Sequence, residues 1–459
     1  MVCIVAQATT ILVTWPLWQV QAESVSLPVL EGLPAPSMGV WILASLALAA
    51  ACPRWGSLLH ALLLTLACLL DQARLQPQLM CVALLLVAAA RVDLRWTARW
   101  FLAALWLWAG LHKFFSPDWH EQSWLLAERL GLSSQTVPGV LRLLIPTYEV
   151  ALGVLALVRP RWAIWLCVPL HLGIAITFSP ILLNYNFSVI PWNLATAITG
   201  SWLLWEACKC RPATIAQRSA ALILLIAPTG FYLGWVDHTL AFVLYSDNLP
   251  RGLITTRDGV REIAADHPTD AVFPYERRLL LQYFQRTAQP GWKLHISDPR
   301  PWLDDEFWVQ EPSGRPRLLS VEEFSAKQPG SFRGVALDNR RAAFRLAIAG
   351  ARLLKRHEHS MIYAVEFSPE SFRREMLQDL SGLLHVEQLQ LRGCPVTDAD
   401  IVQLPLMREL VAIGLSETLV TDHAVTALTK QPKLRFVEVE GTSISLDELT
   451  RAGLQPADR

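Results

Sequence analysis

Long apolar runs fill the first half of this chain, and they constrain its fold more than any other feature. The chain has 459 residues, of which 53% are hydrophobic and 17% charged, and the apolar runs stop near Tyr245. A helix satisfies its own backbone hydrogen bonds, so runs approaching 20 apolar residues predict membrane-spanning helices. We expect about nine spans, near residues 2–20, 38–52, 57–71, 78–91, 95–112, 138–158, 162–179, 188–205 and 219–236.

The second half has a different composition, because it is charged and contains Pro-Gly turns. Residues 274–288 and 340–356 have helical spacing, while residues 291–296 alternate like a strand. These patterns predict a membrane domain over 1–245, a water-soluble α/β region over 246–359 and a repeat region over 360–459. The formal net charge is zero, so the molecule lacks the basic field of a nucleic-acid-binding protein.

The charges of the loops between the apolar runs predict the orientation in the membrane. One set of loops is rich in arginine, including Arg54, residues 91–99 and residues 159–161, and the alternate loops carry more acidic residues. By the positive-inside rule the arginine-rich set faces the cytoplasm. Nine spans then place the carboxyl-terminal half outside the cytoplasm, anchored in a bacterial inner membrane.

Three of the ionisable residues in or beside the apolar runs are candidate site residues. Lys113 follows the Trp-rich run that begins at Phe101, while Glu149 and His171 lie midway along two other runs. Lys113 is either an interfacial anchor or a partly dehydrated amine that acts as a base. Glu149 and His171 either form buried hydrogen bonds between helices or line a polar site. The eight cysteines show no metal-binding spacing, so we expect no metal centre.

The order of motifs in the first half resembles the HTTM superfamily, which contains the vitamin K-dependent γ-carboxylase. That superfamily is distantly similar to DoxX-like and MauE-like membrane proteins. The resemblance implies that Lys113 is a general base acting on a quinone or lipid-linked substrate, with Glu149 and His171 as polar partners. A histidine that the carboxylase carries after its Leu-Leu-Asp segment is absent from residues 72–80, which argues against γ-carboxylation. The matching motifs are Leu69-Leu70-Asp71, Ala109-Gly110-Leu111-His112-Lys113 with Trp119, Glu149 with Gly153, Arg159-Pro160-Arg161, and His171.

The last hundred residues contain an internal repeat with a period of 24. Thr397-Asp398 recurs as Thr421-Asp422, and apolar positions recur at the same step. The pattern resembles bacterial leucine-rich repeats, in which each short unit buries its apolar side by stacking on its neighbours. The recurring apolar residues are Val386, Leu410 and Leu434; Leu389, Ile413 and Val437; Leu391, Leu415 and Val439; and Val396, Val420 and Ile444.

The exposed strand face of such repeats either binds a partner protein or only caps the soluble region. Its predicted residues are Glu387, Gln388, Gln390, Glu409, Ala412, Arg435, Glu438 and Glu440.

Two functional hypotheses follow from these patterns. In the first, the membrane domain anchors a leucine-rich-repeat interaction module. In the second, it is an enzyme that handles a quinone or lipid. The position of Lys113 discriminates between them, because a base needs an accessible cavity and an anchor does not.

Overall fold

The computed structural model describes most of the chain and divides it into two compact units, Met1–Arg333 and Gly334–Arg459. The described residues are 1–20, 25–30, 32–116, 119, 123, 126–128, 130–132, 136–184, 186–206, 213–244, 246, 248–263, 275–326, 334–355 and 361–457.

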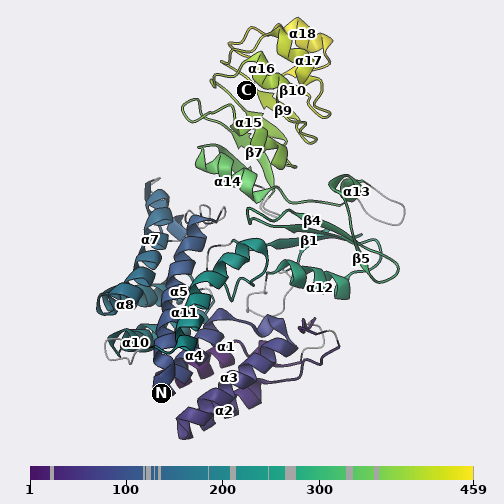
Figure 1. Ribbon diagram of the computed structural model, residues 1–459. Coiled ribbons are helices and arrows are strands. Elements are labelled where there is room, and N and C mark those ends of the chain that lie inside the picture. The colour runs from purple at the N-terminus through teal and green to yellow at the C-terminus, as the bar shows by residue number, and fades with distance from the viewer. Residues whose placement is uncertain are drawn as a thin grey trace. The chain divides into compact units, whose positions relative to one another are not determined.

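Helices occupy the apolar segments of the first unit (Figure 1). Among the described residues, four stretches are long and apolar enough to cross a membrane: Pro53–Leu70, Val140–Val158, Pro160–Phe178 and Ile215–Leu233. The shorter apolar helices leave the predicted number of nine spans unsettled. The helices are α1 (Val2–Val13), α2 (Gly39–Ala51), α3 (Pro53–Leu70), α4 (Pro77–Ala90), α5 (Arg95–Phe114), α7 (Thr136–Val158), α8 (Pro160–Phe178), α9 (Val189–Ala195), α10 (Ser201–Glu206) and α11 (Ile215–Ile226), with the 3₁₀ helix η6 (Ala227–Leu233) continuing α11.

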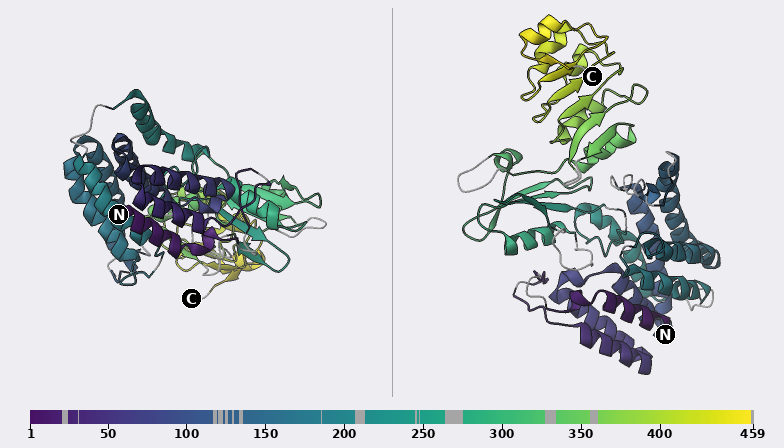
Figure 2. Two further views of the ribbon diagram at one scale, coloured as in Figure 1. Left: turned by 90° about the horizontal axis from the view of Figure 1, so that it is seen from below. Right: turned by 180° about the vertical axis from the view of Figure 1, so that it is seen from behind.

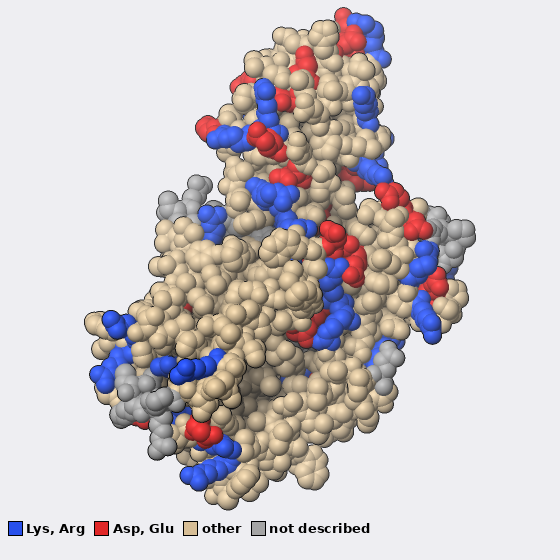
Figure 3. Space-filling view, viewed as in Figure 1, with Lys and Arg blue, Asp and Glu red and all other residues tan. Residues whose placement is uncertain are grey.

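Some helices pack against partners that are near in sequence, as α5 does against α7 and α2 against α3, while others pack against distant ones, as α1 does against α9 and α11 against α5. Figure 2 shows α1, α2 and α3 running alongside one another. In Figure 3 the helical part presents a broad surface with few charged side chains. Large apolar side chains on α8, including Trp162 and Trp165, are exposed in the protein alone, as expected for side chains that face lipid.

A five-stranded antiparallel sheet completes the first unit, in the order β2-β1-β3-β4-β5. The helix α12 (Arg277–Thr287) packs against β1 and β3, and the core between them contains Leu280, Phe284 and Leu294. The strands are β1 (Arg251–Thr255), β2 (Val260–Glu262), β3 (Lys293–Ser297), β4 (Glu306–Gln310) and β5 (Pro316–Leu318).

A six-stranded sheet forms the centre of the second unit, in the order β11-β10-β9-β8-β7-β6. The strands β7 to β11 are parallel, and only β6 runs antiparallel, against β7. Leu389 lies opposite Ile413 on one side and Val365 on the other, so neighbouring strands are offset by 24 residues. The strands are β6 (Arg352–Lys355), β7 (Ile362–Glu366), β8 (Gln388–Gln390), β9 (Ala412–Gly414), β10 (Phe436–Glu438) and β11 (Gln455–Pro456).

The prediction of one helix over 340–356 is wrong in its second half. The helix α14 (Arg340–Ile348) ends before Gly350, whose φ of 99° suits glycine, and the chain then forms β6. The predicted boundary between residues 359 and 360 therefore falls between two strands that pair with each other. Short helices connect the strands: α15 (Met376–Asp379), α16 (Asp398–Val402), α17 (Val425–Leu428) and α18 (Leu446–Arg451).

Candidate functional site

Two glycines set the close approach of α5 and α7. A Cβ atom on Gly110 would lie 2.6 Å from the Pro146 carbonyl oxygen, and one on Gly153 would lie 2.6 Å from the Leu107 backbone nitrogen. Neither distance allows a side chain, so only glycine permits this packing of the two backbones. Gly110 of the Ala-Gly-x-x-Lys motif and Gly153 of the Glu-x-x-x-Gly motif therefore have a structural role. They let α5 and α7 approach closely, and this packing fixes which residues of the two helices face each other.

This register joins Lys113 of α5 to Glu149 of α7. The Lys113 Nζ atom lies 2.8 Å and 3.0 Å from the two carboxylate oxygens of Glu149. It also donates to the carbonyl oxygens of Leu244, at 2.9 Å, and Ala109, at 3.3 Å. The two side chains are 2% and 8% exposed. A lysine that snorkelled into water would be exposed, so Lys113 is a buried, paired cation and not an interfacial anchor.

Trp119 and Pro146 complete the surroundings of the pair. Proline has no backbone N–H, so Pro146 leaves the Arg142 carbonyl without its usual helical donor. The indole N–H of Trp119 donates to that carbonyl at 3.0 Å. The ring centroid of Trp119 lies 5.5 Å from Lys113 Nζ, within cation–π range. The tryptophan that follows the lysine motif therefore contacts both the ammonium group and the proline-interrupted helix.

His171 forms a separate buried arrangement. Its Nε2 atom accepts from the indole N–H of Trp106 at 3.0 Å, so its Nδ1–H donates to Asn193 Oδ1 at 2.7 Å. These bonds link α8 to α5 and α9, and His171 is 2% exposed. The hydrogen bonds therefore join Lys113 to Glu149, while His171 serves a different interhelical junction.

A histidine that the sequence analysis left without a role lies next to Lys113. His112 is fully buried, donates through Nε2 to the Ala241 carbonyl at 2.8 Å, and accepts from the Tyr232 hydroxyl at 2.8 Å. Both bonds reach the segment after α11, as does the bond from Lys113 to Leu244. The adjacency of His112 and Lys113 was the available signal, but the segment that both residues contact is more than 100 residues away in the sequence.

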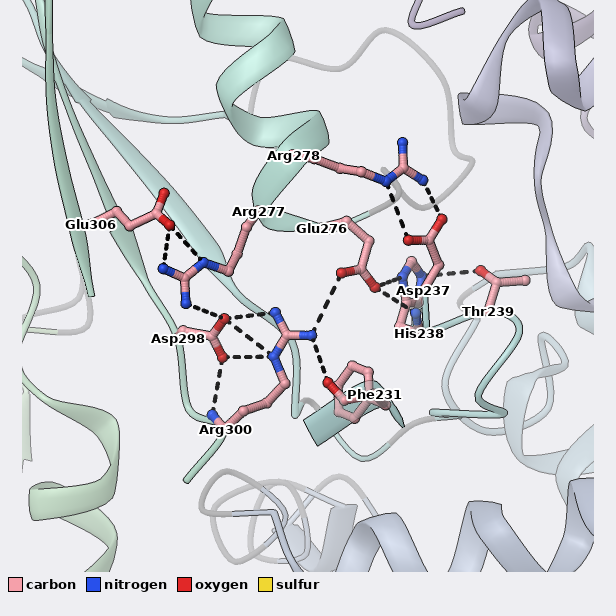
Figure 4. A network of polar contacts seen from close by, with 10 residues as sticks. All are labelled: Phe231, Asp237, His238, Thr239, Glu276, Arg277, Arg278, Asp298, Arg300 and Glu306. Atoms are coloured by element: carbon pink, nitrogen blue, oxygen red, sulfur yellow. Dashed lines mark hydrogen bonds and ion pairs between the residues drawn. The ribbon is translucent and has the colours of Figure 1, made fainter. Parts of the chain in front are cut away.

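A second polar network ties the five-stranded sheet to the helices (Figure 4). The guanidinium of Arg300 is 1% exposed, pairs with Asp298 at 2.7 Å, and donates to the Phe231 carbonyl of η6 at 3.0 Å. Glu276 accepts from the backbone N–H of His238 at 2.5 Å. Because its charges are mutually paired and hydrogen-bonded, the network is a structural junction and offers no free ligand group.

The sheet edge contains a cleft of about 240 Å³, lined by Leu249, Pro250, Arg251, Glu262 and Tyr275. None of the sequence-predicted site residues lines it. Within the described ranges, no cluster of three His, Cys, Asp or Glu side chains has the arrangement of a metal site. The Cys208–Cys210 pair lies outside the described residues, as do His357 and His359.

Comparison with known protein families gives a match that covers this helical region. Residues 86–189 match the family model of the methylamine utilisation protein MauE, a multi-pass membrane protein family. No curated protein and no solved structure matches the chain. The matched segment contains α5, α7 and α8, and with them Lys113, Glu149 and His171. Together with the apolar helices, the match identifies the chain as an integral membrane protein in contact with the lipid bilayer.

Proposed function

We propose that this protein is a membrane anchor of the HTTM type that displays a leucine-rich-repeat interaction module outside the cytoplasm. Residues 1–245 form the membrane domain, residues 246–359 the connecting α/β region, and residues 360–459 the repeats. The module binds a protein partner through the exposed face of its parallel sheet.

The observation that carries the anchor role is the saturation of the Lys113 amine. An ammonium group has three N–H donors, and Lys113 Nζ is already within 3.3 Å of four oxygen acceptors. A general base must offer a lone pair to its substrate. A quinone at this amine would have to displace Glu149 or the Leu244 carbonyl, so the residues as arranged do not fit a quinone. Lys113 instead locks α5, α7 and the segment after η6 together.

Extraction of co-purified lipids and quinones tests the anchor against the enzyme. The wild-type protein is compared with the double variant Lys113→Met/Glu149→Gln, which removes both charges and so leaves no buried ion without a partner. An anchor should give the same lipid profile, without quinone enrichment, in both proteins. Enrichment of one quinone or lipid in the wild type alone would refute the anchor and support an enzyme with Lys113 as base.

The repeat assignment is supported by a hydrogen-bond ladder between equivalent positions. Asp398 accepts from the backbone N–H and the hydroxyl of Thr421, both at 2.7 Å. One period later, Asp422 accepts from the backbone N–H of Ser445 at 2.7 Å. The recurring Thr-Asp pair therefore binds each unit to the next, which is how a quasi-one-dimensional repeat array is stabilised.

Site-specific photo-cross-linking in intact cells tests the module. A benzophenone amino acid at Gln388, on the exposed sheet face, should give a discrete protein adduct. The matched control is Val402 at the end of α16, which is 59% exposed on a different element. Equal adducts at both positions, or none at Gln388, would contradict a binding role for this face.

Protease added to sealed cells tests the orientation. Digestion of the repeats with retention of the membrane domain is the expected result. Protection of the repeats until the membrane is opened would place them in the cytoplasm.

A further inference from the structure

Three exposed aromatic side chains gather where the five-stranded sheet meets the helices. Phe115 is 59% exposed, Trp235 80% and Trp302 69%. They come from three separate places: the end of α5, the turn after η6, and the loop between β3 and β4. We call these three residues the aromatic patch. Contiguous exposed apolar surface of this kind marks an interaction site.

Tyr232 connects two members of the patch, Phe115 and Trp302. Its ring lies edge-to-face with Phe115 at a centroid distance of 5.9 Å and with Trp302 at 6.2 Å. Gly234 precedes Trp235, and a Cβ atom placed on it would lie 3.4 Å from the side chain of Leu303, which follows Trp302. Phe115 and Trp302 therefore share one surface through Tyr232, and the chain beside Trp235 lies close to the loop that carries Trp302.

The loop that carries Trp302 is held in place from behind. Arg300 donates to the Phe231 carbonyl at 3.0 Å, and its guanidinium lies 4.7 Å from the centroid of the Phe231 ring (Figure 4). Its other contacts are to Asp298 and Glu276. These contacts fix the loop before Trp302 meets a partner. Binding through Trp302 therefore costs little additional loop entropy.

We propose that the aromatic patch lies in the headgroup layer of the bilayer and fixes the five-stranded sheet to the membrane surface. The patch is continuous with the membrane helices, because the candidate span Ile215–Leu233 ends two residues before Trp235. Phe115 likewise directly follows α5. Tryptophan is the residue most suited to this depth, since its ring is apolar and its indole N–H still finds water or headgroup oxygens.

The proposal assigns a membrane-contacting role to Trp302, which belongs to the soluble sheet and not to any apolar helix. A lipid occupant is favoured over a protein partner because the patch extends a surface that already faces lipid. Two sets of contacts would then fix the position of the sheet: the buried Arg300 network, which joins it to the helices, and the aromatic patch, which joins it to the bilayer.

Photo-cross-linking in proteoliposomes tests the proposal on the full-length protein. The probe p-benzoylphenylalanine replaces Trp302 in one variant and Trp235 in a second, in vesicles of phosphatidylethanolamine and phosphatidylglycerol. The control places the same probe at Leu318 on β5, which is 54% exposed on the same sheet. Mass spectrometry of the peptides identifies the adducts.

Lipid acyl adducts at positions 302 and 235, several-fold above position 318, are the expected result. Adducts to protein alone at position 302, or lipid adducts equal at 302 and 318, would overturn the proposal. If the variant at position 302 does not fold, the probe at position 235 decides by the same criteria.

Discussion

Replacement of Gly153 by alanine should separate α5 from α7 and weaken the membrane domain. The new Cβ atom would lie 2.6 Å from the Leu107 backbone nitrogen and 2.9 Å from the Ala103 carbonyl oxygen. Ordinary van der Waals contact begins at 3.4 Å, so the two backbones must separate by about 0.8 Å, and overpacking of this kind costs about 1–3 kcal/mol. The same separation stretches the 2.8 Å contact between Lys113 and Glu149.

Gly173 on α8 provides the matched control, because a Cβ atom there meets nothing within 4 Å. Gly173→Ala should be neutral or should stabilise by up to about 1 kcal/mol through helix propensity. Both variants carry the same glycine-to-alanine substitution, so a difference in stability between them reports the packing around each site.

The assay is reversible unfolding in mixed micelles, followed by tryptophan fluorescence, with all three proteins in the same detergent. The expected order of unfolding free energy is Gly173→Ala at or above wild type and Gly153→Ala below it. Equal stability of the two variants would refute the argument that backbone contact at Gly153 sets the helix spacing.

Three further predictions concern single groups. Lys113→Met alone should lower the free energy of unfolding by about 3–5 kcal/mol, because it leaves Glu149 buried without a counter-ion. Adding Glu149→Gln should recover much of this loss, and equal stability of the single and double variants in the same unfolding assay would contradict the prediction. Asp398→Ala should cost about 1–3 kcal/mol, because it leaves two donors of Thr421 without acceptors; thermal unfolding of the repeat unit that matches wild type would count against the ladder. Burial raises the pKa of the Cys394 thiol to about 11. Alkylation of this residue, followed by peptide mass spectrometry, should therefore be slow at neutral pH and accelerate toward pH 11. Fast labelling of the folded protein at pH 7 would show that the thiol is accessible and contradict the prediction.

The sequence by itself predicted the elements whose signals are local. Apolar runs located the helices because each helix satisfies its own backbone groups. The 24-residue step predicted which apolar residues line up, and Leu389 does lie opposite Ile413. The sequence also singled out Lys113 and Glu149, since ionisable residues in apolar runs are conspicuous.

The sequence did not predict that Lys113 and Glu149 form a pair separate from His171. Their pairing depends on the packing of α5 against α7 at Gly110 and Gly153, and only the tertiary structure fixes that register. The end of α14 was missed for a related reason: pairing with β7 makes residues 352–355 a strand despite their helical spacing.

Local periodicity thus indicated most of the helices and where the repeats recur, because those patterns follow from the backbone geometry of each element. The tertiary structure alone decided which buried charges meet and which aromatics share a surface. Lys113 reaches Leu244, and Tyr232 contacts Phe115, across more than 100 residues of sequence. Tyr232 also contacts Trp302 of another element. Such contacts arise from packing between distant elements, and no spacing in the chain encodes them.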